Sequence, residues 1–153
     1  MKRVKSPDEL TELFRARGLR VTAQRQCIFR LLEGNEAHPT AEWVYQRAHA
    51  EMPTMSLKTV YETLRELASI GEIQMLDLGT GSARFDPNVG QHQHLVCQRC
   101  GRTRDIDIDV TGLESLAPEA DDFTIANVEI VFRGHCAECS STEKEKEMER
   151  ARG

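Results

Sequence analysis

The chain has 153 residues, enough for one domain or two small ones. Hydrophobic residues make up 39% of it and charged residues 29%, which is typical of soluble globular proteins. No apolar run approaches the ~18 residues of a membrane-spanning helix, and no apolar segment follows the basic N-terminus, so we expect a cytoplasmic protein rather than a membrane or secreted one.

The charge is unevenly distributed along the chain. The net charge of −5 argues weakly against an acidic partner such as nucleic acid. However, residues 1–35 carry 8 Lys/Arg and 4 Asp/Glu, whereas residues 73–153 carry 9 Lys/Arg and 15 Asp/Glu. An acidic partner is therefore expected to meet the N-terminal half.

The N-terminal half is predicted to form four helices followed by two short strands. Apolar residues recur at helical spacing, as Leu10, Leu13 and Phe14 do in the first helix, and Thr22 and Ser56 are predicted N-caps. The predicted helices cover residues 7–17, 22–33, 39–48 and 57–70, and the strands, 73–78 and 83–85, flank a glycine-rich turn.

Helices followed by a two-stranded hairpin are the pattern of a winged helix-turn-helix, with residues 56–70 as the recognition helix and 73–85 as the wing. A generic small α+β domain is the alternative reading of the same pattern. The predicted organisation is a winged-helix domain at 1–85, a hinge of turn-forming residues at 86–90, a second domain at 91–140 and a charged tail at 141–153.

The second domain is predicted to contain short strands. Residues 94–97 and 104–110 have strand patterns, and the stretch 123–132 is rich in β-branched residues. Leu113 and Leu116 indicate a short helix between them. The tail has almost no apolar residues, so we expect a frayed helix or disorder there, in either case a flexible segment.

Four of the five cysteines lie in two Cys-x-x-Cys steps, formed by Cys97 with Cys100 and by Cys136 with Cys139. Four thiolates at this spacing predict a closed structural Zn²⁺ site, which requires the intervening chain to fold back. A redox-active dithiol, an iron–sulfur cluster or disulfides are the alternatives. Cys27, the fifth, is predicted to be a small core residue.

A second group of metal-binding side chains surrounds the first cysteine step. His92 and His94 are two residues apart and share one face of an extended segment, with Asp86 and Asp105 nearby in the sequence. Imidazole and carboxylate ligands suit Fe²⁺ or Mn²⁺, although Zn²⁺ or Ni²⁺ also fits. The alternative is that each of these His and Asp side chains is simply exposed to solvent at the surface. His38, taken alone, is interpreted as a surface or capping histidine.

Several motifs together resemble the ferric uptake regulator (Fur) family. They are Leu19-Arg20-Val21-Thr22-Ala23-Gln24-Arg25, His38-Pro39-Thr40-Ala41, Leu57-Lys58-Thr59-Val60-Tyr61-Glu62-Thr63-Leu64 and His92-Gln93-His94-Leu95-Val96-Cys97-Gln98-Arg99-Cys100-Gly101, closed by Cys136 and Cys139. The resemblance covers roughly residues 8–140. It implies a winged-helix domain, a C-terminal α/β dimerisation domain, and a homodimer that represses transcription by binding palindromic operator DNA.

The resemblance also assigns the metal ligands. It implies that Cys97, Cys100, Cys136 and Cys139 hold structural Zn²⁺. It further implies that a regulatory Fe²⁺ or Mn²⁺ is held by five residues, which are His38, Asp86, His92, His94 and Asp105. In this reading His38 comes from the DNA-binding domain and ties the two domains together when metal is bound.

Asp rather than Glu at position 105 resembles the peroxide-stress branch of the family. That branch implies oxidation of the metal-bound His38 and His92 by hydrogen peroxide, followed by release of DNA. A homeostasis regulator of iron, manganese or zinc on the same scaffold is the alternative.

Six residues are the predicted DNA contacts, namely Arg20, Gln24, Arg25, Lys58, Tyr61 and Arg65. A solvated helix face is the alternative for each charged one. Glu62 departs from the family pattern, in which Arg often follows the tyrosine, and a carboxylate accepts only from a base amine such as that of cytosine.

Two function classes compete with a DNA-binding regulator. A small metallohydrolase could use the His/Asp group, but the sequence offers no evident general base beside a vacant metal position and no nucleophile elbow, so we expect no enzyme. A zinc-ribbon interaction module without DNA is the other. The expected partners are therefore operator DNA, a second copy of the chain, metal ions and hydrogen peroxide, with no membrane and no other small-molecule substrate.

Overall fold

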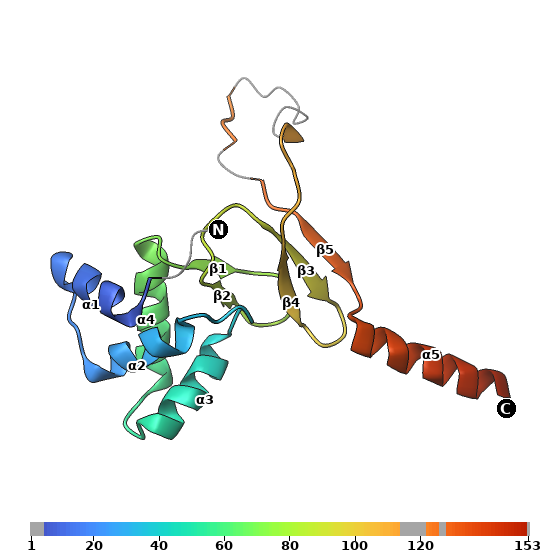
Figure 1. Ribbon diagram of the computed structural model, residues 1–153, viewed down its shortest axis with the longest axis horizontal. Helices are drawn as coiled ribbons and strands as arrows, with labels where there is room; N and C mark the ends of the chain where they lie inside the picture. The colour runs from blue at the N-terminus through green and yellow to red at the C-terminus, as the bar shows by residue number, and fades with distance from the viewer. Residues whose placement is uncertain (1–4, 114–121, 126–127, 153) are drawn as a thin grey trace. The chain divides into compact units, whose positions relative to one another are not determined.

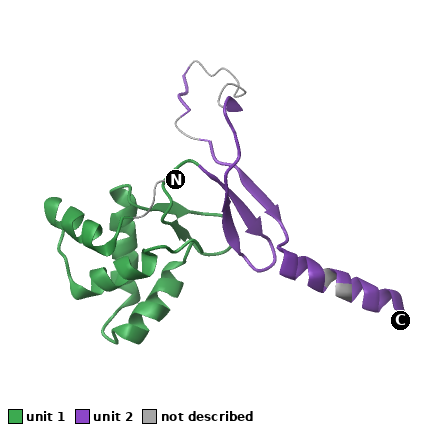
Figure 2. Cartoon of the chain, in the orientation of Figure 1, with its two compact units in different colours: residues 1–91 green, residues 92–153 purple. Residues whose placement is uncertain are grey.

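The computed structural model describes residues 5–113, 122–125 and 128–152 (Figure 1). The chain divides into two compact units, Met1–Gln91 and His92–Gly153 (Figure 2). Within the described residues, unit 1 holds four helices and a hairpin, and unit 2 holds a three-stranded sheet and a long helix. None of the described helices is long and apolar enough to cross a membrane.

The four helices of unit 1 begin at side-chain caps. Ser6, Thr22, Thr40 and Ser56 each accept a hydrogen bond from the backbone N–H three residues further on, which satisfies a donor that lacks a partner at a helix start. The helices are α1 (Pro7–Ala16), α2 (Ala23–Leu32), α3 (Ala41–Glu51) and α4 (Leu57–Ser69). The four predicted helices and the two predicted caps are confirmed, although the third helix begins and ends later than the predicted 39–48.

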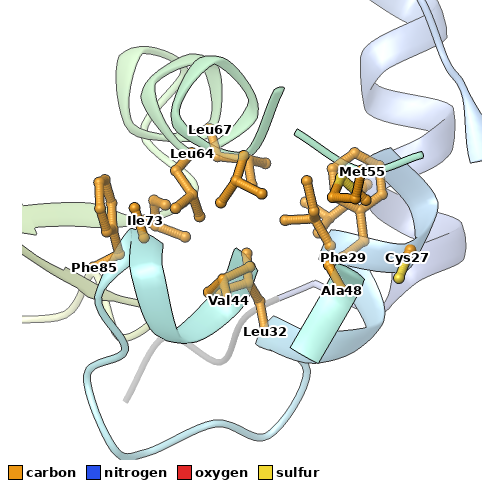
Figure 3. Close-up of a cluster of buried hydrophobic side chains, with 14 of the residues drawn as sticks. Cys27, Phe29, Leu32, Val44, Ala48, Met55, Leu64, Leu67, Ile73 and Phe85 are labelled. Atoms are coloured by element: carbon orange, nitrogen blue, oxygen red, sulfur yellow. The ribbon is translucent and has the colours of Figure 1, made fainter. Parts of the chain in front are cut away.

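The apolar faces of these helices meet in one core, part of which Figure 3 shows. Phe14 of α1 and Phe29 of α2 pack edge to face with ring centroids 4.9 Å apart. Val60, Leu64 and Leu67 place the inner face of α4 in the same core. This packing fixes α4, the predicted recognition helix, and leaves its opposite face exposed.

A hairpin completes unit 1. Strands β1 (Gln74–Leu76) and β2 (Arg84–Asp86) pair antiparallel, as predicted for a wing. The backbone N–H of Phe85 donates to the carbonyl of Pro39 at 2.9 Å, and Thr40 bridges Arg84. The segment before α3 is thereby joined to β2.

Unit 2 is built on a sheet of order β4-β3-β5. Strand β3 (Gln93–Cys97) pairs antiparallel with β4 (Thr103–Ile106) and parallel with β5 (Val131–Gly134). Helix α5 (Ala137–Arg152) follows β5. Of the two forms expected for the tail, a frayed helix or disorder, the structure has a helix, in keeping with the good helix formers Glu, Lys, Arg and Ala in this stretch.

The observed strands are shorter than the sequence patterns suggest, and within 73–78 only Gln74–Leu76 forms β1. The strand expected over 104–110 ends at Ile106 because the backbone beyond it bonds to side chains: Ile108 N–H donates to Gln93 Oε1 at 3.2 Å, and Thr111 N–H donates to Asp109 Oδ1. Of the described residues in the β-branched stretch 123–132, Val131 and Phe132 lie in a strand, where β3 offers a partner. Leu113 lies in a 3₁₀ turn, whereas Leu116 is outside the described residues.

Candidate metal centres and recognition helix

The two Cys-x-x-Cys steps meet in unit 2. The four sulfur atoms, one from each cysteine, lie within 4.8 Å of one another. The parallel pairing of β3 with β5 sets Cys97 opposite Gly134, which brings Cys136 to the first step. The Sγ atoms of Cys100 and Cys136 are 3.8 Å apart. The cluster fits the closed tetrahedral zinc site that the sequence predicts.

Backbone groups favour charge on one of these sulfurs. The N–H groups of Cys100 and Cys136 point at the Cys97 sulfur, the latter at 3.4 Å, and lower the pKa of Cys97 to about 5. In contrast, desolvation and the neighbouring thiol of Cys136 raise the pKa of Cys139 to about 12. Four thiols this close cannot all ionise unless a cation joins them, and thiolates are the donors that Zn²⁺ prefers.

Unit 1 contributes one pair of candidate ligands. His38 Nε2 lies 3.2 Å from Asp86 Oδ2, and both side chains are almost fully buried. His38 has a φ of +50°, a left-handed conformation that is uncommon outside glycine. Arg84 Nη1 donates to the His38 carbonyl at 3.2 Å, and Asn88 N–H donates to Asp86 Oδ1 at 2.8 Å. The surroundings therefore hold a strained, buried histidine beside a carboxylate, which differs from the surface or capping histidine expected of His38 alone, and the cap of α3 is Thr40.

Unit 2 contributes three further candidates. His92 Nε2 and His94 Nε2 are 3.0 Å apart. Asp105 Oδ1, on the strand opposite His94, lies 3.3 Å from His92 Nε2 and 3.7 Å from His94 Nε2. Three atoms with lone pairs thus converge on one point, an arrangement that a proton or a cation between them stabilises. We name these residues the β3–β4 triad.

The remaining histidines and the fifth cysteine lie outside these clusters. Cys27 is fully buried in the core of unit 1, as predicted, and burial raises the pKa of its thiol. His49 is exposed on α3, with Nδ1 3.3 Å from the Met55 carbonyl oxygen. His135, beside Cys136, is also exposed.

Helix α4 exposes Lys58 and Arg65, whereas Tyr61 between them is half-buried and packs against the core. The Tyr61 hydroxyl donates to Glu42 Oε1 of α3 at 2.7 Å, and the Arg65 guanidinium lies 5.7 Å from the Tyr61 ring centroid. Lys58 is largely exposed, with Nζ 3.7 Å from Glu62 Oε1. Sequence reasoning missed the role of Glu42, because nothing in the sequence joins residues 19 positions apart on two helices.

Near the start of helix α2, Arg25 is bonded inside unit 1, whereas Arg20 is exposed to solvent. Arg25 Nη2 lies 2.7 Å from Glu66 Oε2, its Nη1 donates to the Arg20 carbonyl at 2.7 Å, and its guanidinium lies over Phe14. Arg25 is therefore engaged inside unit 1. Arg20 itself is exposed, and Gln24 Nε2 donates to the Thr54 carbonyl at 3.1 Å.

Comparison with known proteins identifies the family. The model of the Ferric uptake regulator family matches residues 16–133. The chain belongs to the ferric uptake regulator family. The family predicted from the motifs is thus confirmed, and the chain is a metal-dependent regulator rather than an enzyme, which removes the metallohydrolase alternative.

Individual relatives agree with this assignment. The chain is 35% identical over 133 residues to a peroxide-responsive repressor, PerR, of Staphylococcus aureus, covering 86% of this chain and 90% of that protein. A zinc-bound manganese uptake regulator aligns with 30% identity and a TM-score of 0.65, covering 83% and 98%. The Fur protein of Helicobacter pylori, 19% identical, shares the fold with a TM-score of 0.74, covering 92% and 97%.

Proposed function

We propose that this protein is a cytoplasmic transcriptional repressor that binds palindromic operator DNA as a homodimer when a regulatory metal ion is bound. Membership of the Fur family and 35% identity to a peroxide-responsive repressor support this function. The excess of basic residues in 1–35 and the exposed polar face of α4 are what a DNA-binding domain needs. A zinc-ribbon module without DNA has no use for either.

Of the proposed DNA contacts, Arg20, Lys58 and Arg65 are exposed, whereas Gln24 and Tyr61 are half-buried. Arg20 and Lys58 contact phosphates, while Tyr61 and Arg65 lie on the reading face of α4 and Gln24 lies beside it in the same interface. Arg25 was predicted from sequence as a further contact, but its guanidinium is held by Glu66 and the Arg20 carbonyl. We therefore propose that Arg25 positions α2 against α4 instead.

Two metal sites are proposed. Cys97, Cys100, Cys136 and Cys139 hold a structural Zn²⁺ that stabilises unit 2. The His38–Asp86 pair and the β3–β4 triad together hold one regulatory Fe²⁺ or Mn²⁺. The close approach of His92, His94 and Asp105 carries this proposal, because three lone-pair atoms converge there, and two more ligands complete a five-ligand site.

This ligand set gives a mechanism for the switch. The ion favours the arrangement of the two units in which all five ligands reach it, and DNA affinity changes only by the ion's preference for that arrangement. Two reading helices set about one helical turn apart in the dimer then match the operator half-sites. Of the five proposed ligands, His38 is the one whose backbone lies in the left-handed region, and its position is therefore fixed by its surroundings in unit 1.

Peroxide sensing is the finer part of the proposal. Bound Fe²⁺ would activate hydrogen peroxide toward a histidine ring, which gives up the two electrons, and Mn²⁺ would support DNA binding without this reaction. One oxygen atom of the peroxide is added to the imidazole ring of His38 or His92, and the other leaves as water. An oxidised ring is a poorer ligand, so the link between the units is lost and DNA is released. Asp105 and the similarity to PerR support this branch.

Mass spectrometry of peptides after peroxide treatment tests the proposal. The zinc-loaded protein is charged anaerobically with Fe²⁺, or with Mn²⁺ as the control, and then exposed to hydrogen peroxide. We expect one added oxygen on the peptide of His38 or His92 with iron only, together with loss of operator binding. Iron-loaded protein that keeps both histidines unmodified and still binds DNA after peroxide contradicts the sensor.

Metal homeostasis is the second candidate function. The similarity to a zinc-bound manganese uptake regulator favours it. In that case operator binding follows the concentration of Mn²⁺ or Fe²⁺ and is indifferent to peroxide. Titration of operator binding with each metal, with and without peroxide, separates the two functions.

A further inference from the structure

Helix α4 carries two glutamates with different environments. Glu66 Oε2 lies 2.7 Å from Arg25 Nη2, and this pair joins α4 to α2 inside unit 1. Glu62 instead lies on the exposed face, with 57% of its side chain accessible. It is thus the one carboxylate of α4 that faces outward together with Lys58, Tyr61 and Arg65.

A carboxylate on a DNA-facing helix is repelled by phosphates unless its charge is compensated. Lys58, one turn earlier, provides the compensation, since its Nζ lies 3.7 Å from Glu62 Oε1. An ammonium has three N–H donors, so Lys58 can contact Glu62 and a phosphate at the same time. Both residues lie in the first two turns of α4, the part of a recognition helix whose side chains reach base edges.

The chemistry of the base edges selects the partner of Glu62. An ionised carboxylate only accepts hydrogen bonds, so it is repelled by the acceptors of guanine and thymine in the major groove. Adenine offers its N6 amine, but beside the acceptor N7. Cytosine offers its N4 amine with a C–H group beside it and no neighbouring acceptor on the same base.

We propose that Glu62 determines base specificity by accepting a hydrogen bond from the N4 amine of a cytosine at one position in each operator half-site. Lys58 cancels its charge during the approach to DNA. The inference rests on the proposed DNA-binding function and adds the base class that the α4 face selects. The neighbouring Tyr61, tied to Glu42, and Arg65 lie on the same face and read or clamp other positions.

Selection of bound duplexes from a randomised pool tests this role of Glu62. The probe is double-stranded DNA, and the protein is the Mn²⁺-loaded wild-type chain or its variants. We expect the wild type to enrich cytosine at one position in each half-site. Glu62→Ala loses this enrichment and leaves the other positions unchanged. Glu62→Gln moves the preference toward adenine, which a glutamine amide can bind at N6 and N7 together, by roughly tenfold.

Two controls make the outcomes distinct. Glu33→Gln changes an exposed glutamate at the end of α2 and should leave the selected sequences unchanged. Lys58→Met should weaken binding to all sequences, and less so when Glu62 is already Gln, because no carboxylate then needs compensation. Identical sequence preferences for wild type and both Glu62 variants overturn the inference alone. Failure of the wild type to bind any duplex with Mn²⁺ overturns the proposed function as well.

Discussion

The hydroxyl of Tyr61 donates a hydrogen bond to Glu42 Oε1 across 2.7 Å, and this bond joins the proposed reading helix α4 to α3. The Arg65 guanidinium lies near the same ring. Tyr61 is therefore held in place before any DNA arrives. A side chain that is already ordered loses less conformational entropy on binding.

Removal of this bond should reduce stability. We expect Tyr61→Phe and Glu42→Ala each to lower the free energy of unfolding by about 1 kcal/mol, the usual net worth of a half-buried hydrogen bond. Urea unfolding at neutral pH measures the effect. Since both variants remove one interaction, the double variant should be little worse than either. Fully additive losses would show that the two side chains act independently.

The same bond predicts a dependence on alkaline pH. The hydrogen bond to Glu42 raises the pKa of Tyr61 above its ordinary 10.0. A raised pKa in the folded state means that the stabilisation is complete below pH 10.0 and is lost as the pH rises through the higher value. The stability difference between wild type and Tyr61→Phe should therefore shrink in strongly alkaline solution. A constant difference across that range contradicts the assigned proton donor.

The cysteine cluster predicts that unit 2 depends on zinc. Cys136→Ser replaces a thiolate with a hydroxyl that remains protonated, so the chain should lose bound zinc, the dimer and the protection of β3 and β5 from hydrogen exchange. Zinc content, sedimentation and exchange rates measure these losses. Cys27→Ala is the matched control, because Cys27 lies in the core of unit 1 and should leave zinc bound. A stable, zinc-free dimer of Cys136→Ser contradicts the structural role.

A substitution in the β3–β4 triad should affect the proposed regulatory metal site and leave the proposed zinc site intact. His92→Ala removes a proposed ligand whose Nε2 lies 3.0 Å from His94 Nε2 and which belongs to no cysteine step. We expect the variant to keep its zinc and to lose operator binding in response to Mn²⁺, measured by fluorescence anisotropy of labelled DNA. His49→Ala, an exposed histidine of α3, serves as the control. A normal Mn²⁺ response in His92→Ala shows that the ligand assignment is wrong.

Two substitutions of His38 should differ in their effect on stability but not in their effect on the metal response. Its φ of +50° suits glycine better than a residue with a Cβ atom. His38→Gly should therefore be more stable than His38→Ala by about 1 kcal/mol, since alanine keeps the strain without any ligand contacts. Both variants should lose the Mn²⁺ response equally. Equal stability of the two variants would show that the left-handed backbone imposes no strain.

Local patterns were sufficient to predict most elements of the fold. The helices of unit 1 begin where Ser and Thr caps stand, and apolar spacing identifies their inner faces. The stretch 123–132 shows the limit of such patterns, because β-branched residues favour a strand only where a partner strand is available. In the structure Phe123 and Ile125 lie outside any strand and are exposed.

Only part of the candidate site could be predicted from the sequence. The four cysteines and the pair His92 and His94 follow from spacing, because two short steps and strand alternation bring these atoms together. By contrast, the burial and left-handed backbone of His38 depend on its bonds to the hairpin. The pairing of Arg25 with Glu66 likewise joins residues 41 positions apart, which no local pattern encodes.

That pairing leads to the last prediction, which separates structural from DNA-contacting arginines. Each phosphate contact that is removed lowers the slope of log affinity against log salt concentration by about one. Arg20→Ala should lower this slope, because the side chain is exposed beside α2. Arg25→Met should leave the slope unchanged but lower the free energy of unfolding by about 1 kcal/mol, since it removes a mostly buried pair with Glu66.

Glu66→Gln is the matched variant for Arg25, since it weakens the same pair from the other side. It should reproduce the loss of stability of Arg25→Met and leave the salt dependence of operator binding unaltered. Urea unfolding and binding titrations over a range of salt concentrations measure both quantities. A reduced slope for Arg25→Met, with normal stability, would return Arg25 to the DNA interface and assign Glu66 the role of orienting it.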